Sequence, residues 1–228
     1  QGLDLTRATL RAVIKYPWPR KTKPGDGKPD KSTKQGKKWA AYRSEREAFD
    51  FAMALPVDAG GRADDYRARS LEAEVMDWAD DVTYAIHDLD DFYRAGLIPL
   101  AELLDGSSEL ERFVEFASTQ LEKPLKVVSD AWTRLRGRLP RFSYAGTRKH
   151  QRFVHGSTTD LIGRFLLAFQ VGNGGGTPLV QIRDEARLGV DVLKQLTWRY
   201  VILRPGLATQ QEGQKRIIRF LYEYYVGL

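Results

Sequence analysis

Length, composition and charge place this chain among globular proteins. Its 228 residues, 42% of them hydrophobic, are enough to bury a full core in one domain. No apolar run reaches the roughly 18 residues that a membrane span requires, no signal-peptide pattern opens the sequence, and cysteine is absent. We therefore expect a cytoplasmic protein that has no disulfides and no membrane partner.

The first part of the chain predicts two helices separated by a basic loop. Apolar residues between Leu3 and Ile14 recur with helical spacing, and residues 37–55 have the composition of a second helix that ends at Pro56. Residues 20–38 hold eight basic and two acidic side chains among prolines and glycines, which predicts a flexible loop over 19–38. This loop is either a solvated linker or a surface that binds phosphate or nucleic acid.

The most informative segment is a long amphipathic helix predicted over residues 64–93. Residues 70–93 hold eight carboxylates and no lysine or arginine. At 100° per residue the apolar side chains fall on one face: Leu71, Val75, Trp78, Val82, Ala85 and Leu89. The polar face gathers Asp77, Asp80, Tyr84, His87, Asp88 and Asp91. Each pair of neighbouring like charges costs roughly 0.2–0.5 kcal/mol on an exposed helix, so we expect a divalent cation, or arginines of another element, to offset them.

Three residues of the polar face are spaced one turn apart. Asp80 offers an oxygen ligand of the kind that Mg²⁺ and Mn²⁺ prefer. Tyr84 and Asp88, one and two turns further on, could hold a polar substrate beside such a metal. The alternative is an acidic surface stripe without a ligand.

The remainder of the chain is also predicted to be helical, which makes the expected fold all-α. Pro and Gly punctuation separates helices at 108–121, 125–135, 157–171, 184–201 and 209–225, with a short strand near 179–182. Residues 131–159 hold seven lysines and arginines, two histidines and several aromatic side chains but no acid. This segment either recognises phosphates and bases or neutralises the acidic helix. No nucleophile motif and no phosphate-binding P-loop is present.

Two sequence motifs resemble a known enzyme family. The run MDWADDVTYAIHDLDDF at 76–92 resembles the fourth conserved block of the HD-domain deoxynucleoside triphosphate triphosphohydrolases, the dGTPase family. LRAVIKYPW at 10–18, followed by KKWAAYRSE at 37–45, resembles that family's LKYP and K-x-G-x-Y-x-S-E region. The resemblance implies an HD-domain-like helical bundle that hydrolyses a dNTP to a deoxynucleoside and inorganic triphosphate.

The resemblance also implies roles for individual residues. Asp80 would bind the divalent metal, Mg or Mn, Tyr84 would contact the phosphates, and Asp88 would accept a hydrogen bond from the sugar 3′-hydroxyl. Three more positions match residues that bind the triphosphate: Lys15, Tyr16 and Lys38.

The chain departs from the family pattern in one respect that matters for function. The family's His and His-Asp metal ligands lie upstream of its first residue, so the catalytic residues stay unknown, and Ala40 replaces a family glycine. We therefore expect one helical domain over 1–228, the C-terminal part of such an enzyme, completed by the N-terminal HD-motif portion of the same protein and assembled as a homo-oligomer. The rival function is a non-catalytic helical module for nucleic-acid binding or oligomerisation. A third combines both, because some relatives respond to single-stranded DNA.

Overall fold

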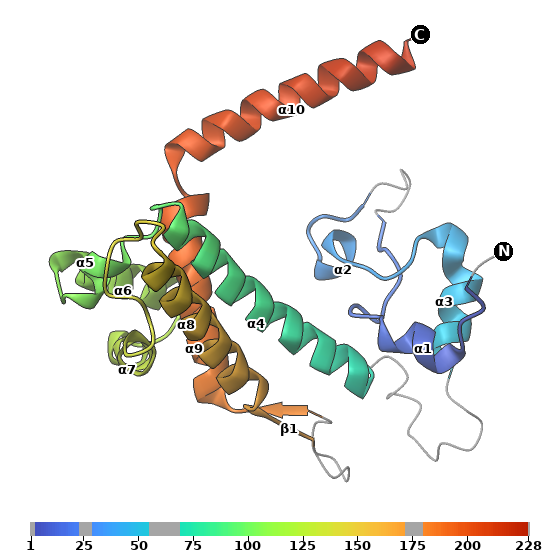
Figure 1. Ribbon diagram of the computed structural model, residues 1–228. Coiled ribbons are helices and arrows are strands. Elements are labelled where there is room, and N and C mark those ends of the chain that lie inside the picture. The colour runs from blue at the N-terminus through green and yellow to red at the C-terminus, as the bar shows by residue number, and fades with distance from the viewer. Residues whose placement is uncertain (1–2, 23–28, 55–68, 172–179, 228) are drawn as a thin grey trace. The chain divides into compact units, whose positions relative to one another are not determined.

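The computed structural model describes residues 3–22, 29–54, 69–171 and 180–227, and it confirms an all-α fold for them (Figure 1). Their only sheet pairs two strands, β1 (Phe169–Val171) and β2 (Val180–Ile182), the second of which was predicted. The chain divides into two units, residues 1–80 with 171–180, and residues 81–170 with 181–228. The single domain expected over 1–228 stays a prediction.

The first unit is built from short helices. They are α1 (Arg7–Ala12), α2 (Lys34–Lys37), the 3₁₀ helix η1 (Arg43–Glu45), α3 (Arg46–Met53) and the start of α4 (Leu71–Arg94). Helix α1 begins where the Thr6 hydroxyl accepts the backbone N–H of Thr9, at 3.2 Å, which satisfies one of the free amides of its first turn. A small core of Ala41, Phe49 and Met53, against which Ile14 packs, joins α1 to α3.

The prediction of a helix over 37–55 is wrong at its start, because the chain between α2 and η1 is extended. The backbone N–H of Ala40 donates to Trp18 O at 3.1 Å, and that of Arg20 donates to Ala41 O at 3.0 Å. This pairing with a distant segment replaces the hydrogen bonds that a helix would have made. The helix starts only at Arg43, after the Glu45 carboxylate accepts the Tyr42 N–H at 2.9 Å. In the loop expected at 19–38, the described residues form α2 and a bridge between Thr22 and Pro29, and 23–28 lie outside the described residues.

Helix α4 matches the predicted amphipathic helix, except that it begins at Leu71; residues 64–68 lie outside the described range. The Ser70 hydroxyl accepts the N–H of Ala73 at 3.1 Å and so caps the first turn. Beyond the last turn, Gly96 has a φ of +69°, the left-handed conformation in which glycine commonly terminates helices. Four residues of the predicted apolar face are at most 4% exposed: Trp78, Val82, Ala85 and Leu89.

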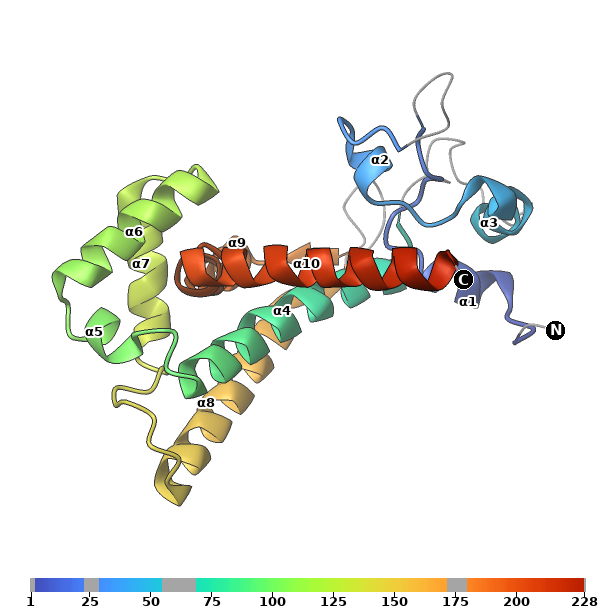
Figure 2. The same cartoon turned by 90° about the horizontal axis from the view of Figure 1, so that it is seen from above.

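The second unit contains longer helices. They are α5 (Leu100–Leu104), α6 (Ser108–Leu121), α7 (Leu125–Arg136), α8 (Arg148–Leu166), α9 (Asp184–Thr197), the π-helix η3 (Trp198–Ile202) and α10 (Pro205–Val226). Helices α6, α7 and α9 pack on one another (Figure 2). Phe113 and Trp132 are fully buried there, and their rings are in edge-to-face contact at 5.5 Å. Helix α8 lies alongside the C-terminal part of α4 (Figures 1 and 2).

Several predicted boundaries in this unit are corrected. Helix α8 starts at Arg148 and not at 157, because the Thr147 hydroxyl accepts the His150 N–H at 3.2 Å and caps it there. It ends at Leu166, and the last residues of the predicted helix form β1. Helix α10 starts at Pro205, a residue well suited to a first helical turn.

Helix α10 buries none of its described residues. Its C-terminal half exposes Ile217, Ile218, Phe220, Leu221, Tyr222, Tyr224, Tyr225 and Val226. These side chains give the helix an exposed apolar surface. None of the described helices is both long and apolar enough to cross a membrane.

Candidate functional site

Lys15 joins the first motif to the acidic helix. Its Nζ lies 2.6 Å from Asp77 Oδ1 and 2.9 Å from Asp80 Oδ2. Arg69 donates to the other oxygen of Asp77. The positive charge that the acidic face was predicted to need is therefore supplied, at this point, by one lysine and one arginine from outside the helix.

The surroundings of this cluster keep its members charged. Partial burial alone would lower the pKa of Lys15, but hydrogen bonds to Asp77 and Asp80 outweigh it and raise the pKa above its usual value. Burial alone would raise the pKa of Asp77, but hydrogen bonds from Lys15 and Arg69 outweigh it and hold that pKa below its usual value. The cluster is thus a stable arrangement of ion pairs at neutral pH.

Local structure fixes the position of Lys15. It follows α1 in a turn in which its N–H donates to Val13 O at 3.1 Å. Its neighbour Ile14 packs against the core of the first unit, which anchors the turn. Asp77 and Asp80 are three residues apart on α4 and so share a face, which lets one ammonium group contact both carboxylates.

Tyr16 and Lys38 also come together, from the two halves of the LKYP-like region. Lys38 Nζ lies 5.5 Å from the centre of the Tyr16 ring, within the range of a cation–π contact. The indole N–H of Trp18 donates to Lys38 O at 2.7 Å and so links the two segments. No hydrogen bond or ion pair within the described part of the chain joins Tyr16 or Lys38 to Asp80. The six predicted residues therefore include two contacting pairs, Lys15 with Asp80 and Tyr16 with Lys38.

Tyr84 and Asp88 lie on the same continuous helix as Asp80, one and two turns further along the same face. Tyr84 is 62% exposed, so its hydroxyl is accessible to a ligand. Asp88 is half-buried, and burial raises the pKa of its carboxyl, as does the charge of Asp91. Asp81, which points in another direction, pairs with Lys194 at 2.8 Å.

The basic segment at 131–159 does not neutralise the acidic helix. Among the described residues, the carboxylates of α4 form ion pairs with Lys15, Arg69, Arg94 and Lys194. Arg138 pairs instead with Asp160, at 2.9 Å. His150 has a structural role, because its Nδ1 accepts the Ala145 N–H at 3.0 Å and its ring stacks on Phe142.

The described residues do not complete a metal site, since no three of their His, Cys, Asp or Glu side chains are grouped to hold an ion. Asp80 is the single predicted ligand, and its side chain is 44% exposed. A carboxylate of this kind suits a hard cation, but further donors would have to come from other residues.

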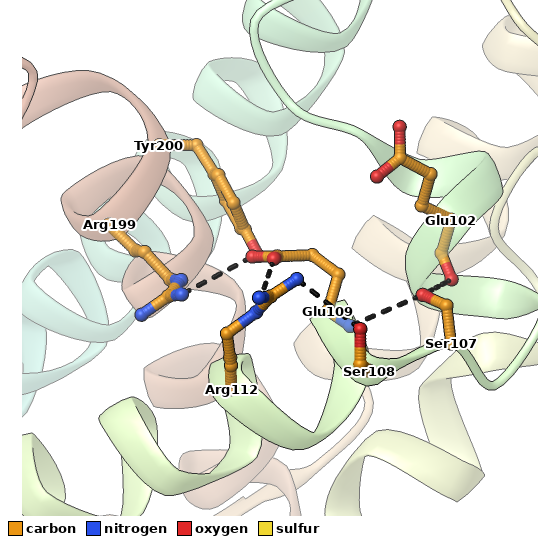
Figure 3. A network of polar contacts seen from close by, with 7 residues as sticks. All are labelled: Glu102, Ser107, Ser108, Glu109, Arg112, Arg199 and Tyr200. Carbon is orange, nitrogen blue, oxygen red and sulfur yellow. Dashed lines mark hydrogen bonds and ion pairs between the residues drawn. The ribbon is translucent and has the colours of Figure 1, made fainter.

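Sequence reasoning missed a polar network that joins α6 to the π-helix (Figure 3). Glu109 accepts hydrogen bonds from the Tyr200 hydroxyl at 2.6 Å and from Arg199 at 3.3 Å, and its other oxygen accepts one from Arg112 at 2.9 Å. The Tyr200 hydrogen bond is the largest influence that holds the pKa of Glu109 below its usual value. Burial, followed by the bond to Glu109, raises the pKa of Tyr200. Nothing in the sequence signals a contact between residues 91 positions apart.

Fold and site together define an all-α protein in which a lysine that follows α1 contacts two aspartates of α4. Comparison with known proteins gives the relationship directly. The chain is 32% identical to a deoxyguanosinetriphosphate triphosphohydrolase-like protein of Streptomyces coelicolor, over 97% of this chain and 52% of that protein. Proteins of the same name from Corynebacterium efficiens and Corynebacterium diphtheriae are 28% and 29% identical over 98% and 99% of this chain.

The resemblance inferred from the motifs is thus confirmed: the chain is related over nearly its whole length to the dGTP triphosphohydrolase-like proteins. It spans about half the length of the curated relatives it matches, 52% in each of these three. No family model matches the chain.

Proposed function

We propose that the protein is a metal-dependent triphosphohydrolase that cleaves a dNTP to a deoxynucleoside and inorganic triphosphate. The observation that carries the proposal is the contact of Lys15 with Asp80. It joins two segments 65 residues apart that each resemble the same family, at the residues expected to bind triphosphate and metal. The names of the relatives support the same class of reaction.

Lys15 has two effects in this proposal. With Arg69 it balances the charges of Asp77 and Asp80, which would otherwise repel an anionic substrate. It also places an ammonium group where a phosphate beside Asp80 would meet it. Lys38, which lies against the Tyr16 ring, supplies a second cationic group.

Tyr84 and Asp88 orient the remainder of the substrate. The exposed Tyr84 hydroxyl donates to a phosphate oxygen, and the Asp88 carboxylate accepts a hydrogen bond from the sugar 3′-hydroxyl. Their spacing along α4 matches a ligand laid along the helix, with its phosphates toward Asp80.

Asp80 contributes one ligand to a divalent metal such as Mg²⁺ or Mn²⁺. The metal, when bound, polarises phosphate oxygens and lowers the pKa of a bound water. The remaining donors belong to an N-terminal HD-motif portion of the same protein. A homo-oligomer is the proposed assembly, and the apolar surface of α10 supports such a contact.

The test is an assay of inorganic triphosphate released from each of the four dNTPs by the protein that includes the HD-motif portion, with Mg²⁺ or Mn²⁺ and with chelator. Release of triphosphate that depends on the metal is expected, and phosphate or pyrophosphate as the product would contradict the proposal. A non-catalytic nucleic-acid module would instead show no hydrolysis and a binding affinity that falls steeply with salt, with a log–log slope of about −0.9 per phosphate contact.

A further inference from the structure

A pocket lies between α7, α8 and α9 in the second unit, and its volume is about 320 Å³. Four arginines line it: Arg134 in the last turn of α7, Arg138 just after that helix, Arg164 on α8, and Arg183 just before α9. We call it the arginine pocket. None of its lining residues belongs to the candidate site described above.

The charge of this pocket is strongly unbalanced. Among its lining residues the one carboxylate is that of Glu185. Asp160, outside the lining, pairs with Arg138 at 2.9 Å and only distantly with Arg164, at 3.9 Å. Arg134 and Arg183 form no ion pair with any described residue. Guanidinium groups gathered in this way repel one another, and a bound anion would offset that repulsion.

The floor of the pocket is apolar and closely packed. It is formed by Leu135, Leu161 and Phe165, which are at most 6% exposed. Gly189 on α9 faces Phe165, and a Cβ at that position would lie 3.1 Å from a ring carbon of the phenylalanine. The missing side chain of the glycine therefore leaves room for the Phe165 ring against α9.

The volume of the arginine pocket and its lining residues indicate which class of ligand would fit it. A volume of about 320 Å³ is at the low end of the roughly 300–1,000 Å³ of small-molecule sites. Guanidinium groups bind phosphate oxygens through paired hydrogen bonds, and the apolar floor offers a surface for a sugar or a base. A simple inorganic anion would leave this floor uncovered.

We propose that the arginine pocket binds a nucleoside phosphate, with the phosphates on Arg134 and Arg183 and the nucleoside against the apolar floor. The two arginines without an ion-pair partner hold the phosphates. Arg138 and Arg164, which share Asp160, line the remaining wall.

Arginine modification tests the position of the site. The protein is treated with phenylglyoxal in the presence of chelator, with and without dGTP, and the modified arginines are identified by peptide mass spectrometry. We expect dGTP to protect Arg134 and Arg183 but not Arg148 and Arg152, which are exposed arginines of the basic segment at 131–159 and lie outside the pocket. Equal protection of all four arginines, or of none, would overturn the proposal.

Other probes in the same experiment separate the ligand classes. Deoxyguanosine without phosphates should not protect, and inorganic triphosphate should protect only at higher concentration than dGTP. If triphosphate protected as well as dGTP, the role of the floor would be refuted. If a short oligothymidylate protected at lower concentration than dGTP, the pocket would be a nucleic-acid site and not a nucleotide site.

Matched variants test the affinity. The double variant Arg134→Ala/Arg183→Ala should weaken dGTP binding in chelator by roughly tenfold or more for each lost guanidinium. Arg148→Ala/Arg152→Ala removes the same number of charges outside the pocket and should change the binding less than about twofold, a residual set by long-range charge alone. Circular dichroism checks that both variants keep their helices. Equal weakening in the two double variants would show that net charge, and not the pocket, binds the nucleotide.

Discussion

Replacement of Lys15 by alanine removes the cation that contacts both Asp77 and Asp80. Lys15 and Asp77 are about a quarter exposed, and Asp80 is 44% exposed. A hydrogen bond between charged groups contributes about 1.5–3 kcal/mol, whereas an exposed ion pair contributes about 0–1 kcal/mol. For two partly screened contacts we expect the free energy of unfolding to fall by about 1–2 kcal/mol, since Asp77 keeps its bond from Arg69.

The effect on activity should be larger than the effect on stability. Under the proposed function, the variant loses one phosphate contact and also the charge that screens two carboxylates from the substrate. A loss of about 2–3 kcal/mol in transition-state binding corresponds to a fall in kcat/KM of roughly 30- to 150-fold.

Two variants control this experiment. Lys15→Arg keeps the charge and should keep most of the stability. Lys21→Ala removes an exposed lysine outside the cluster and should change neither the unfolding free energy nor kcat/KM. Urea denaturation and triphosphate release are measured on all three. If Lys15→Ala behaved like Lys21→Ala in both assays, the role given to the Lys15 cluster would be wrong.

Three further predictions concern other parts of the chain. Glu109→Gln should lower the unfolding free energy by about 1–2 kcal/mol at neutral pH. Because the folded-state pKa of Glu109 is below its usual 4.5, this difference is present above pH 4.5 and disappears as the pH falls through the folded-state pKa. Urea denaturation of both proteins at several pH values measures the difference. Gly189→Ala should destabilise the protein by about 1–3 kcal/mol through overpacking. Gly156→Ala, at a position where a Cβ meets nothing within 4 Å, should instead stabilise α8 by up to about 1 kcal/mol. Thermal denaturation measures both changes, and changes of the same sign would refute the packing argument. Asp88→Asn should leave the metal dependence of triphosphate release unchanged. It should reduce the preference for substrates with a 3′-hydroxyl over 3′-deoxy analogues, because an amide accepts a weaker hydrogen bond than a carboxylate. An unchanged preference would show that Asp88 does not bind the sugar.

The amphipathic helix could be predicted because its signal is local. A 3.6-residue period places Trp78, Val82 and Leu89 on one face whatever the rest of the chain does, and all three are buried. The position of Asp80, Tyr84 and Asp88 on one face follows from the same period.

Features that depend on distant segments could not be predicted in this way. Residues 38–42 have a helical composition, yet their backbone pairs with residues 18–20 and is extended. The basic segment predicted Arg134 and Arg138 as phosphate-binding candidates, but Arg164 and Arg183 join them only through the packing of three helices. The spacing of residues along the sequence does not predict contacts between segments that are far apart in the chain.

The proposed function makes Asp80 a metal ligand and gives no such role to its neighbour Asp81. Asp81 pairs with Lys194, and both side chains are more than one third exposed, so its loss should cost little stability. The most direct test measures triphosphate release by Asp80→Ala and Asp81→Ala in the protein that carries the HD-motif portion, since both changes remove one carboxylate from the same helix. We predict that Asp80→Ala abolishes triphosphate release and that Asp81→Ala keeps most of it; equal activities of the two variants, or wild-type activity in Asp80→Ala, would contradict the proposed site.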